Sequence, residues 1–181
     1  NEDGRMARLN DLFKFSKKHK IKLASIEDLI SYRLKYEKLI LRLSSKVIIS
    51  NKYGKIHIYS YKNKLENNIN LVISKGKLNP NKSVPVRVIS TKIKNLNILN
   101  NINIKNSLRI LSKYKNFLLL IINSNETTKD YSTNTLRYYG IGAQIIKDLN
   151  IKNMILISRS KKKIIGLEGF GLRIKKQKII K

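Results

Sequence analysis

The chain has 181 residues, of which 41% are hydrophobic, and its 39 Lys and Arg against 11 Asp and Glu give a formal net charge of +28. This length suits one ordinary domain, or one domain with an appendage, and the hydrophobic fraction suffices for a packed core. The absence of cysteine excludes disulfides and thiolate metal sites, and no run of about 18 uncharged apolar residues is present to form a membrane-spanning helix. The first residue is Asn and no signal peptide follows it, so we expect a piece of a longer, soluble, cytoplasmic protein without a membrane partner.

The N-terminal segment predicts helical structure. Residues 8–18 place apolar side chains on one helical stripe and lysines outside it, which is the pattern of an amphipathic helix. Residues 21–24 suggest a short strand, and Ser25 can then cap a second helix with Asp28 at its third position. Residues 33–38 are charged and are the best candidate for a linker. The side chains of the second helix that we expect to point inward are Ile26, Leu29 and Ile30.

From residue 39 the hydrophobic period changes to that of strands. Residues 46–49 and 55–61 flank a turn at residues 51–54, and alternation on the second arm predicts a hairpin. Two further strands are predicted at residues 68–74 and 86–90, separated by a loop that contains Gly76, Pro80 and Pro85.

The second half mixes predicted helices and buried strands. Asn106 can cap a helix, the apolar run 117–122 predicts a buried strand, and the polar residues 123–135 predict a loop. The remaining predictions are a helix at 140–149 entered through Gly140-Ile141-Gly142, a strand at 154–158 and a turn-rich strand pair at 164–174. The chain as a whole therefore predicts an α+β fold, a mixed β-sheet with packed helices, preceded by a short helical segment.

Two segments carry resemblances to known families. The sequence NEDGRMARL at residues 1–9, with IKLASIEDLISYR at residues 21–33, resembles the last portion of 3,4-dihydroxy-2-butanone 4-phosphate synthase. Residues 137–172 resemble the C-terminal region of GTP cyclohydrolase II, and in many bacteria the two enzymes are fused in this order. The resemblance implies a riboflavin-biosynthesis protein with a synthase end at residues 1–38 and a GTP cyclohydrolase II-like domain at residues 39–181. It also implies an upstream synthase domain as partner and a homodimer of the full protein.

The resemblance also shows what is missing. The synthase family takes its acidic loop and His-Thr-Glu segment from regions upstream of the matched part. The cyclohydrolase family has an Arg-Val-His-Ser-Glu-Cys strand end at its zinc and nucleotide site. Here Arg87, Val88 and Ser90 match that pattern, whereas Ile89, Thr91 and Lys92 replace its His, Glu and first Cys. A tetrahedral zinc site of this family needs thiolates, so we expect no zinc, no other cofactor and no catalytic residue of the cyclohydrolase.

Part of the family's nucleotide site is retained. The family's Arg-Gln-Glu-Gly-Arg-Gly loop and the downstream catalytic Asp and Arg have no match after residue 122. Ser158 stands where the family has a threonine, and Lys163 falls on its GTP-contacting lysine. The residues that this implies for a vestigial site binding GTP or phosphate weakly are Arg87, Ser90, Ser158 and Lys163.

Three interpretations of function remain open. The first is a degenerate cyclohydrolase-like domain that supports or regulates the fused synthase, which leaves open whether the chain is an enzyme. The second is a basic nucleic-acid-binding module. Against it, the lysines are spread along the chain among Ile and Asn, as a proteome biased toward these residues would produce. Nonspecific binding to polyanions is expected in either case. The third is an active cyclohydrolase with altered metal chemistry; His19 and His57 lie in separate predicted elements and form no recognisable ligand set.

Overall fold

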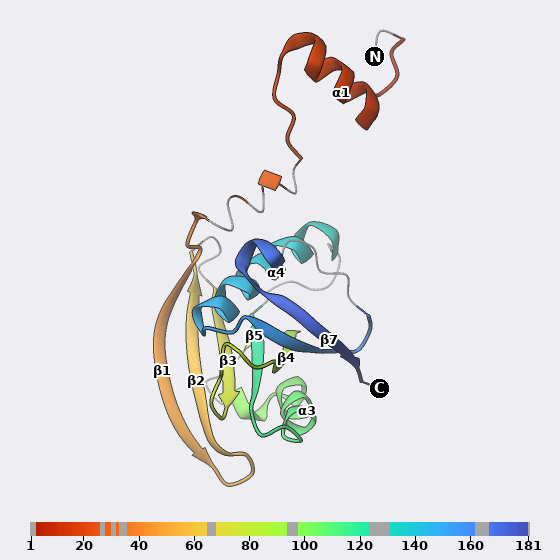
Figure 1. Ribbon diagram of the computed structural model, residues 1–181. Helices are drawn as coiled ribbons and strands as arrows, with labels where there is room; N and C mark the ends of the chain where they lie inside the picture. Colours follow the sequence, from red (N-terminus) through yellow and green to blue (C-terminus); the bar gives the residue numbers. More distant parts are fainter. Residues whose placement is uncertain are drawn as a thin grey trace.

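The computed structural model describes residues 3–25, 28–29, 32, 36–64, 68–93, 98–123, 131–161 and 167–180. Its centre is a seven-stranded sheet in the order β1-β2-β3-β5-β4-β6-β7 (Figure 1). The strands are β1 (Ile40–Ser50), β2 (Gly54–Asn63), β3 (Ile69–Lys75), β4 (Val84–Ser90), β5 (Phe117–Ile122), β6 (Asn153–Ser158) and β7 (Arg173–Ile179).

The sheet has an antiparallel and a parallel half. Strands β1, β2, β3 and β5 pair antiparallel in succession, whereas β4 pairs parallel with both β5 and β6, and β6 pairs parallel with β7. All six residues of β5 are buried, which is the pattern of a strand covered on both faces. The strands predicted at residues 46–49, 55–61, 68–74, 86–90, 117–122 and 154–158 are confirmed.

Two helices cover opposite faces of the sheet. Helix α3 (Ile102–Leu111) packs its buried Ile104, Leu108 and Leu111 against one face, and α4 (Tyr131–Asp148) packs residues such as Ile141 and Ile145 against the other. Alternate residues of β5 belong to the two resulting cores, because successive side chains of a strand point to opposite faces. The predicted α+β class with a mixed sheet and packed helices is confirmed.

Four predicted elements differ from the structure, two in where they begin and two in kind. Helix α3 is capped by Asn101, not Asn106, because the Asn101 side chain accepts hydrogen bonds from the amides of Asn103 and Ile104. Helix α4 begins at Tyr131, so Gly140-Ile141-Gly142 lies inside the helix, although the close packing expected there is real: a Cβ on Gly142 would lie 3.2 Å from Leu120. Of the strand pair predicted at 164–174, residues 164–166 lie outside the described residues, residues 167–170 form a 3₁₀ turn (Leu167–Phe170), and strand β7 begins only at Arg173. Residues 21–24 form no strand.

The N-terminal helix α1 (Leu9–His19) confirms the predicted amphipathic helix, yet none of its residues is buried. Figure 1 shows it standing apart from the sheet. The expected cap at Ser25 is present, since Ser25 Oγ accepts from the Asp28 amide at 2.9 Å, and hydrogen bonds from Ser25 lower the pKa of Asp28. Leu29, expected to point inward, is exposed, and Ile26 and Ile30 lie outside the described residues. None of the described helices is long and apolar enough to span a membrane.

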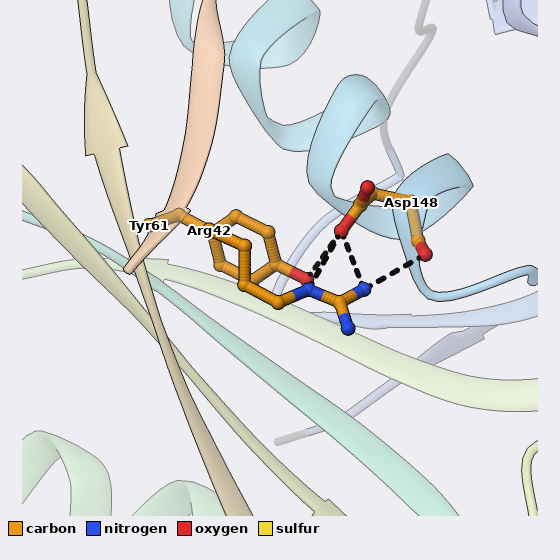
Figure 2. A network of polar contacts seen from close by, with 3 residues as sticks. All are labelled: Arg42, Tyr61 and Asp148. Atoms are coloured by element: carbon orange, nitrogen blue, oxygen red, sulfur yellow. Dashed lines mark hydrogen bonds and ion pairs between the residues drawn. The ribbon is translucent and has the colours of Figure 1, made fainter. Parts of the chain in front are cut away.

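A polar cluster fastens the β1–β2 hairpin to the end of α4, as Figure 2 shows. Asp148 accepts from Arg42 Nε at 3.0 Å and from the hydroxyl of Tyr61, a fully buried residue, at 2.9 Å. Burial, together with the hydrogen bond and charge of Asp148, raises the pKa of Tyr61. Burial alone would lower the pKa of Arg42, but Asp148 and Tyr61 outweigh it and the net direction is upward. Gln144 supports the same attachment, because its side-chain nitrogen donates to the carbonyl of Glu37 at 2.8 Å and its side-chain oxygen accepts from the amide of Leu39 at 3.0 Å.

We predict that Asp148→Ala lowers the free energy of unfolding by about 1–3 kcal/mol, because it leaves the buried Tyr61 hydroxyl without its acceptor. Tyr61→Phe removes the hydroxyl together with its need for a partner and is expected to be less harmful. In the double variant the two losses should not add, since both changes remove one shared interaction. Urea denaturation of the four proteins measures this coupling, and strictly additive losses would contradict it.

The raised pKa of Tyr61 also predicts a dependence of stability on pH. Because the folded protein holds the phenol proton to a higher pH than the unfolded chain, this contribution is complete below about pH 10, the ordinary pKa of tyrosine, and is lost as the pH rises above it. The lysines also titrate in this range, so the test is the difference between the unfolding free energies of wild type and Tyr61→Phe. As the pH rises from 9 to 11, the free energy of unfolding of the wild type should fall relative to that of Tyr61→Phe.

Candidate functional site

The carboxyl ends of the parallel strands β4, β5 and β6 lie at one edge of the sheet. The chain leaves β4 toward α3 on one face and leaves β5 toward α4 on the other, so the crossover direction reverses between these neighbouring strands. Such a reversal opens the place where α/β sheets bind their ligands, outside the carboxyl ends of the strands. This edge is therefore the candidate functional site.

The structure brings three of the four predicted site residues to this region. Ser90 ends β4 and pairs in register with Ile122 at the end of β5, while Ser158 ends the neighbouring strand β6. The Ser158 hydroxyl donates to the carbonyl of Ser160 at 2.7 Å, so it closes a turn at the strand end. Arg87 lies three residues before the end of β4. The fourth residue, Lys163, lies outside the described residues.

Arg87 is the most unusual of these residues because its side chain is charged and only 6% exposed. Its Nε donates to Ser107 Oγ of α3 at 3.0 Å, and a terminal nitrogen donates to the carbonyl of Ile157 at 3.4 Å. Burial lowers the pKa of Arg87, and the nearby charge of Arg159 lowers it further. Within the described parts of the chain no carboxylate pairs with Arg87. Two neighbouring cations without a paired carboxylate favour an anion at this place.

Asparagine and threonine side chains organise the rest of the edge. The Thr91 hydroxyl accepts weak hydrogen bonds from the side-chain nitrogens of Asn101, the cap of α3, and Asn103, in its first turn, at 3.4 and 3.5 Å. On the β5 side, Asn123 Oδ1 accepts from the Ile93 amide at 3.1 Å. The backbone amide of Asn123 donates in turn to Asn70 at 3.0 Å. These contacts fix the two loops that leave β4 and β5, and they add no ionisable group to the site.

The donor chemistry at this edge does not suit zinc. The residues after Arg87 supply an apolar chain at Ile89, a hydroxyl at Thr91 and an ammonium at Lys92, and the sequence holds no thiolate. Among the residues that the structure describes, no three His, Asp or Glu side chains gather as a metal site would require. His19 lies on α1 beside Phe15, and His57 lies on β2 beside Tyr59, so the two histidines belong to separate elements.

The sequence does not predict the asparagine network, because residues 92–106 repeat Ile, Asn, Leu and Lys and are low in complexity. One signal was available: Asn101 is followed by Ile104, Leu108 and Leu111, which is the spacing of a capped amphipathic helix. The contacts of Asn70 and Asn123 have no such local signal, since they join strands that pair only in the folded sheet.

Comparisons with known proteins agree with this architecture. The family model described as GTP cyclohydrolase II matches residues 100–178. The chain is 30% identical to the riboflavin biosynthesis protein RibBA of Aquifex aeolicus over 203 residues, which covers 96% of this chain and 50% of that protein. It is 32% identical to a 3,4-dihydroxy-2-butanone 4-phosphate synthase of Photobacterium phosphoreum, with 96% and 53% covered.

A solved structure shares the fold. The crystal structure of RibBX, a two domain 3,4-dihydroxy-2-butanone 4-phosphate synthase from A. baumannii, matches with a TM-score of 0.64 and 28% identity. That match covers all of this chain and 52% of the other. The chain thus spans about half the length of the curated relatives that it matches.

Proposed function

We propose that this chain is part of a riboflavin-pathway protein, and that its GTP cyclohydrolase II-like domain has lost GTP ring opening and supports a 3,4-dihydroxy-2-butanone 4-phosphate synthase in the same polypeptide. The observation that carries this proposal is the absence of cysteine from this chain, because the reaction of the family that it resembles uses a zinc ion bound by cysteines. Without such an ion, no group described at the sheet edge lowers the pKa of water into the neutral range.

The N-terminal segment supports the second half of the proposal. Leu9, Phe13 and Phe15 of α1 are each more than half exposed, and Met6 before the helix is 85% exposed. Several large apolar side chains exposed on one short helix favour a contact with another protein surface. We assign residues 1–38 to the end of the synthase domain, whose remaining residues would cover part of α1.

The names of two relatives support the same assignment of roles to the two domains. The A. baumannii protein is a two domain synthase, and the Photobacterium phosphoreum relative is also named as a synthase, with no cyclohydrolase in either name. Both extend well beyond the part that matches this chain. Both names fit a protein in which the synthase domain is active and the cyclohydrolase-like domain has no activity of its own.

A residual anion site fits within this proposal. Arg87, Ser90 and Ser158 lie around the carboxyl ends of β4 and β6, and Lys163 follows β6 in the sequence. Most of the contacts that the family makes with GTP are absent, so this site would hold GTP or phosphate weakly. In the full protein it is a candidate for regulation of the synthase by a phosphate ligand.

The proposal is tested in the full-length polypeptide. We expect that ending the chain after Lys38 lowers the melting temperature of the synthase domain by several degrees, about 2–4 °C for each kcal/mol lost, and reduces its activity. Light scattering of both forms shows whether residues 39–181 also contribute to a homodimer. Equal melting temperature, equal activity and the same number of subunits in the two forms would leave the cyclohydrolase-like domain without a supporting role.

A further inference from the structure

The β1–β2 hairpin presents a small aromatic surface that the proposed function does not use. His57 and Tyr59 point to the same face of β2, and their rings lie 6.3 Å apart with an angle of only 13° between their planes. Both side chains are half-buried, so part of each ring meets solvent. On the neighbouring strand, Val47 and Ile49 lie opposite His57 and Lys55 and are 52% and 82% exposed.

The charge of the hairpin is of one sign. Residues 40–63 contain Arg42, Lys46, Lys52, Lys55 and Lys62, and they contain no Asp or Glu. Arg42 is neutralised by Asp148 of α4, so four lysines lack a carboxylate within the hairpin. Figure 1 shows the β1–β2 turn at the end of the hairpin away from α4. Lys52 and Lys55 lie at this turn, whereas Lys62 lies near the other end of β2. Lys46 and Lys62 belong to the face opposite that of His57 and Tyr59, because side chains alternate along a strand.

We propose that this face of the β1–β2 hairpin binds single-stranded nucleic acid. Partly exposed aromatic rings on a sheet face stack unpaired bases, and surrounding lysines contact the phosphates, which is a combination that single-strand binders share. The parallel rings of His57 and Tyr59 offer a stacking surface for bases, with the Arg42 guanidinium already lying over the Tyr59 ring, 5.5 Å from its centre. Lys55 stands beside His57 on the same face. Binding is indifferent to sequence, because every base has an aromatic face.

The stacking step separates this proposal from simple attraction to a chain of charge +28. A duplex carries the higher density of phosphate but keeps its bases stacked inside, so pure electrostatic attraction favours the duplex. Stacking on His57 and Tyr59 favours the single strand. A second copy of the chain is the other candidate occupant of the apolar β1 edge, and the positive charge of both copies opposes it.

The test uses fluorescence anisotropy of labelled RNA, as a 12-nucleotide single strand and as a duplex of the same length, between 50 and 200 mM salt. At 150 mM salt we expect the single strand to bind more tightly than the duplex. His57→Ala and Tyr59→Leu should each weaken single-strand binding about 5- to 100-fold with the salt slope unchanged, since they remove stacking without charge. Tyr59→Leu keeps an apolar side chain where Tyr59 packs on the core, and circular dichroism confirms that both variants fold.

Two controls complete the design. Tyr36→Ala removes a tyrosine that is 64% exposed but lies outside the hairpin, and it should leave binding unchanged. Lys55→Gln should reduce the salt slope by about one released ion. Tighter binding of the duplex, or equal affinity of wild type and both ring variants, overturns the proposal. A mass twice that of the monomer, lost in a Val47→Lys variant, would assign the face to a second copy and overturn it as well.

Discussion

The purified chain is expected to hold no stoichiometric zinc and to leave GTP unopened. In the cyclohydrolase family, zinc bound by thiolates activates the attacking water, and a bound zinc ion lowers the pKa of water from 15.7 to about 7. This sequence has no cysteine, and Ile89, Thr91 and Lys92 stand where the first zinc-site residues of the family would lie. We expect the rate to fall to that of the uncatalysed reaction, a loss of at least about 10⁶-fold relative to an enzyme.

Metal analysis and a GTP turnover assay on the same sample decide this prediction. Substituting Thr91 or Lys92 with Cys should restore neither zinc nor turnover, because a single thiolate is not a tetrahedral ligand set. About one zinc per chain together with ring-opened product would contradict the prediction, and would mean that other donors have replaced the thiolates.

The same samples test the residual anion site. If a pocket remains, GTP should bind in the high micromolar to millimolar range, about −4 to −6 kcal/mol, because few contacts are left. Lys163→Ala should then weaken binding more than Lys161→Ala, since salt screens both lysines alike but only Lys163 matches a nucleotide contact of the family. Equal losses in the two variants, measured by calorimetry, would mean that only the diffuse positive field attracts phosphate.

The sequence predicts the strands of this fold better than it predicts the helices. The apolar run of β5 and the alternation of β2 are local patterns, and both strands lie where those patterns indicate. Helix α4 begins at Tyr131 among polar residues that favour turns as much as helices, so no periodic signal marks its start. The parallel pairing of β7 with β6 follows from contacts across the sheet, which residues 164–174 alone do not encode.

The sequence likewise predicts only part of the candidate site. Arg87, Ser90 and Ser158 could be named from the resemblance, and they share an edge because β4 and β6 are parallel neighbours. The burial of Arg87 under α3, and its contact with Ser107, could not be named because the start of that helix was misplaced. Site residues that belong to a local motif can thus be predicted from the sequence, whereas contacts between elements that meet only in the folded sheet cannot.

Gly76→Ala is expected to lower the free energy of unfolding by about 2–5 kcal/mol. Gly76 has a φ of +70°, where an L side chain is strained, and a Cβ there would lie 2.8 Å from the carbonyl oxygen of Lys115 and 3.0 Å from the Cβ of Asn116. The left-handed conformation accounts for about 1–2 kcal/mol, and overlap with backbone in a packed site adds about 1–3 kcal/mol. The overlap arises because Lys75 pairs with Phe117, so the residues next to both are pressed together where β3 and β5 meet.

Gly54→Ala is the matched control for this prediction. Gly54 has a φ of +73°, nearly that of Gly76, but nothing lies within 4 Å of the place where its Cβ would stand. The variant should therefore lose only the conformational part, about 1–2 kcal/mol. Urea denaturation gives the loss of unfolding free energy in each variant, and the difference between the two losses is the cost of placing a Cβ at residue 76 against residues 115–116. Equal losses would mean that the loop after β3 moves aside at little cost, and that the packing of Gly76 against residues 115–116 does not hold β3 and β5 together.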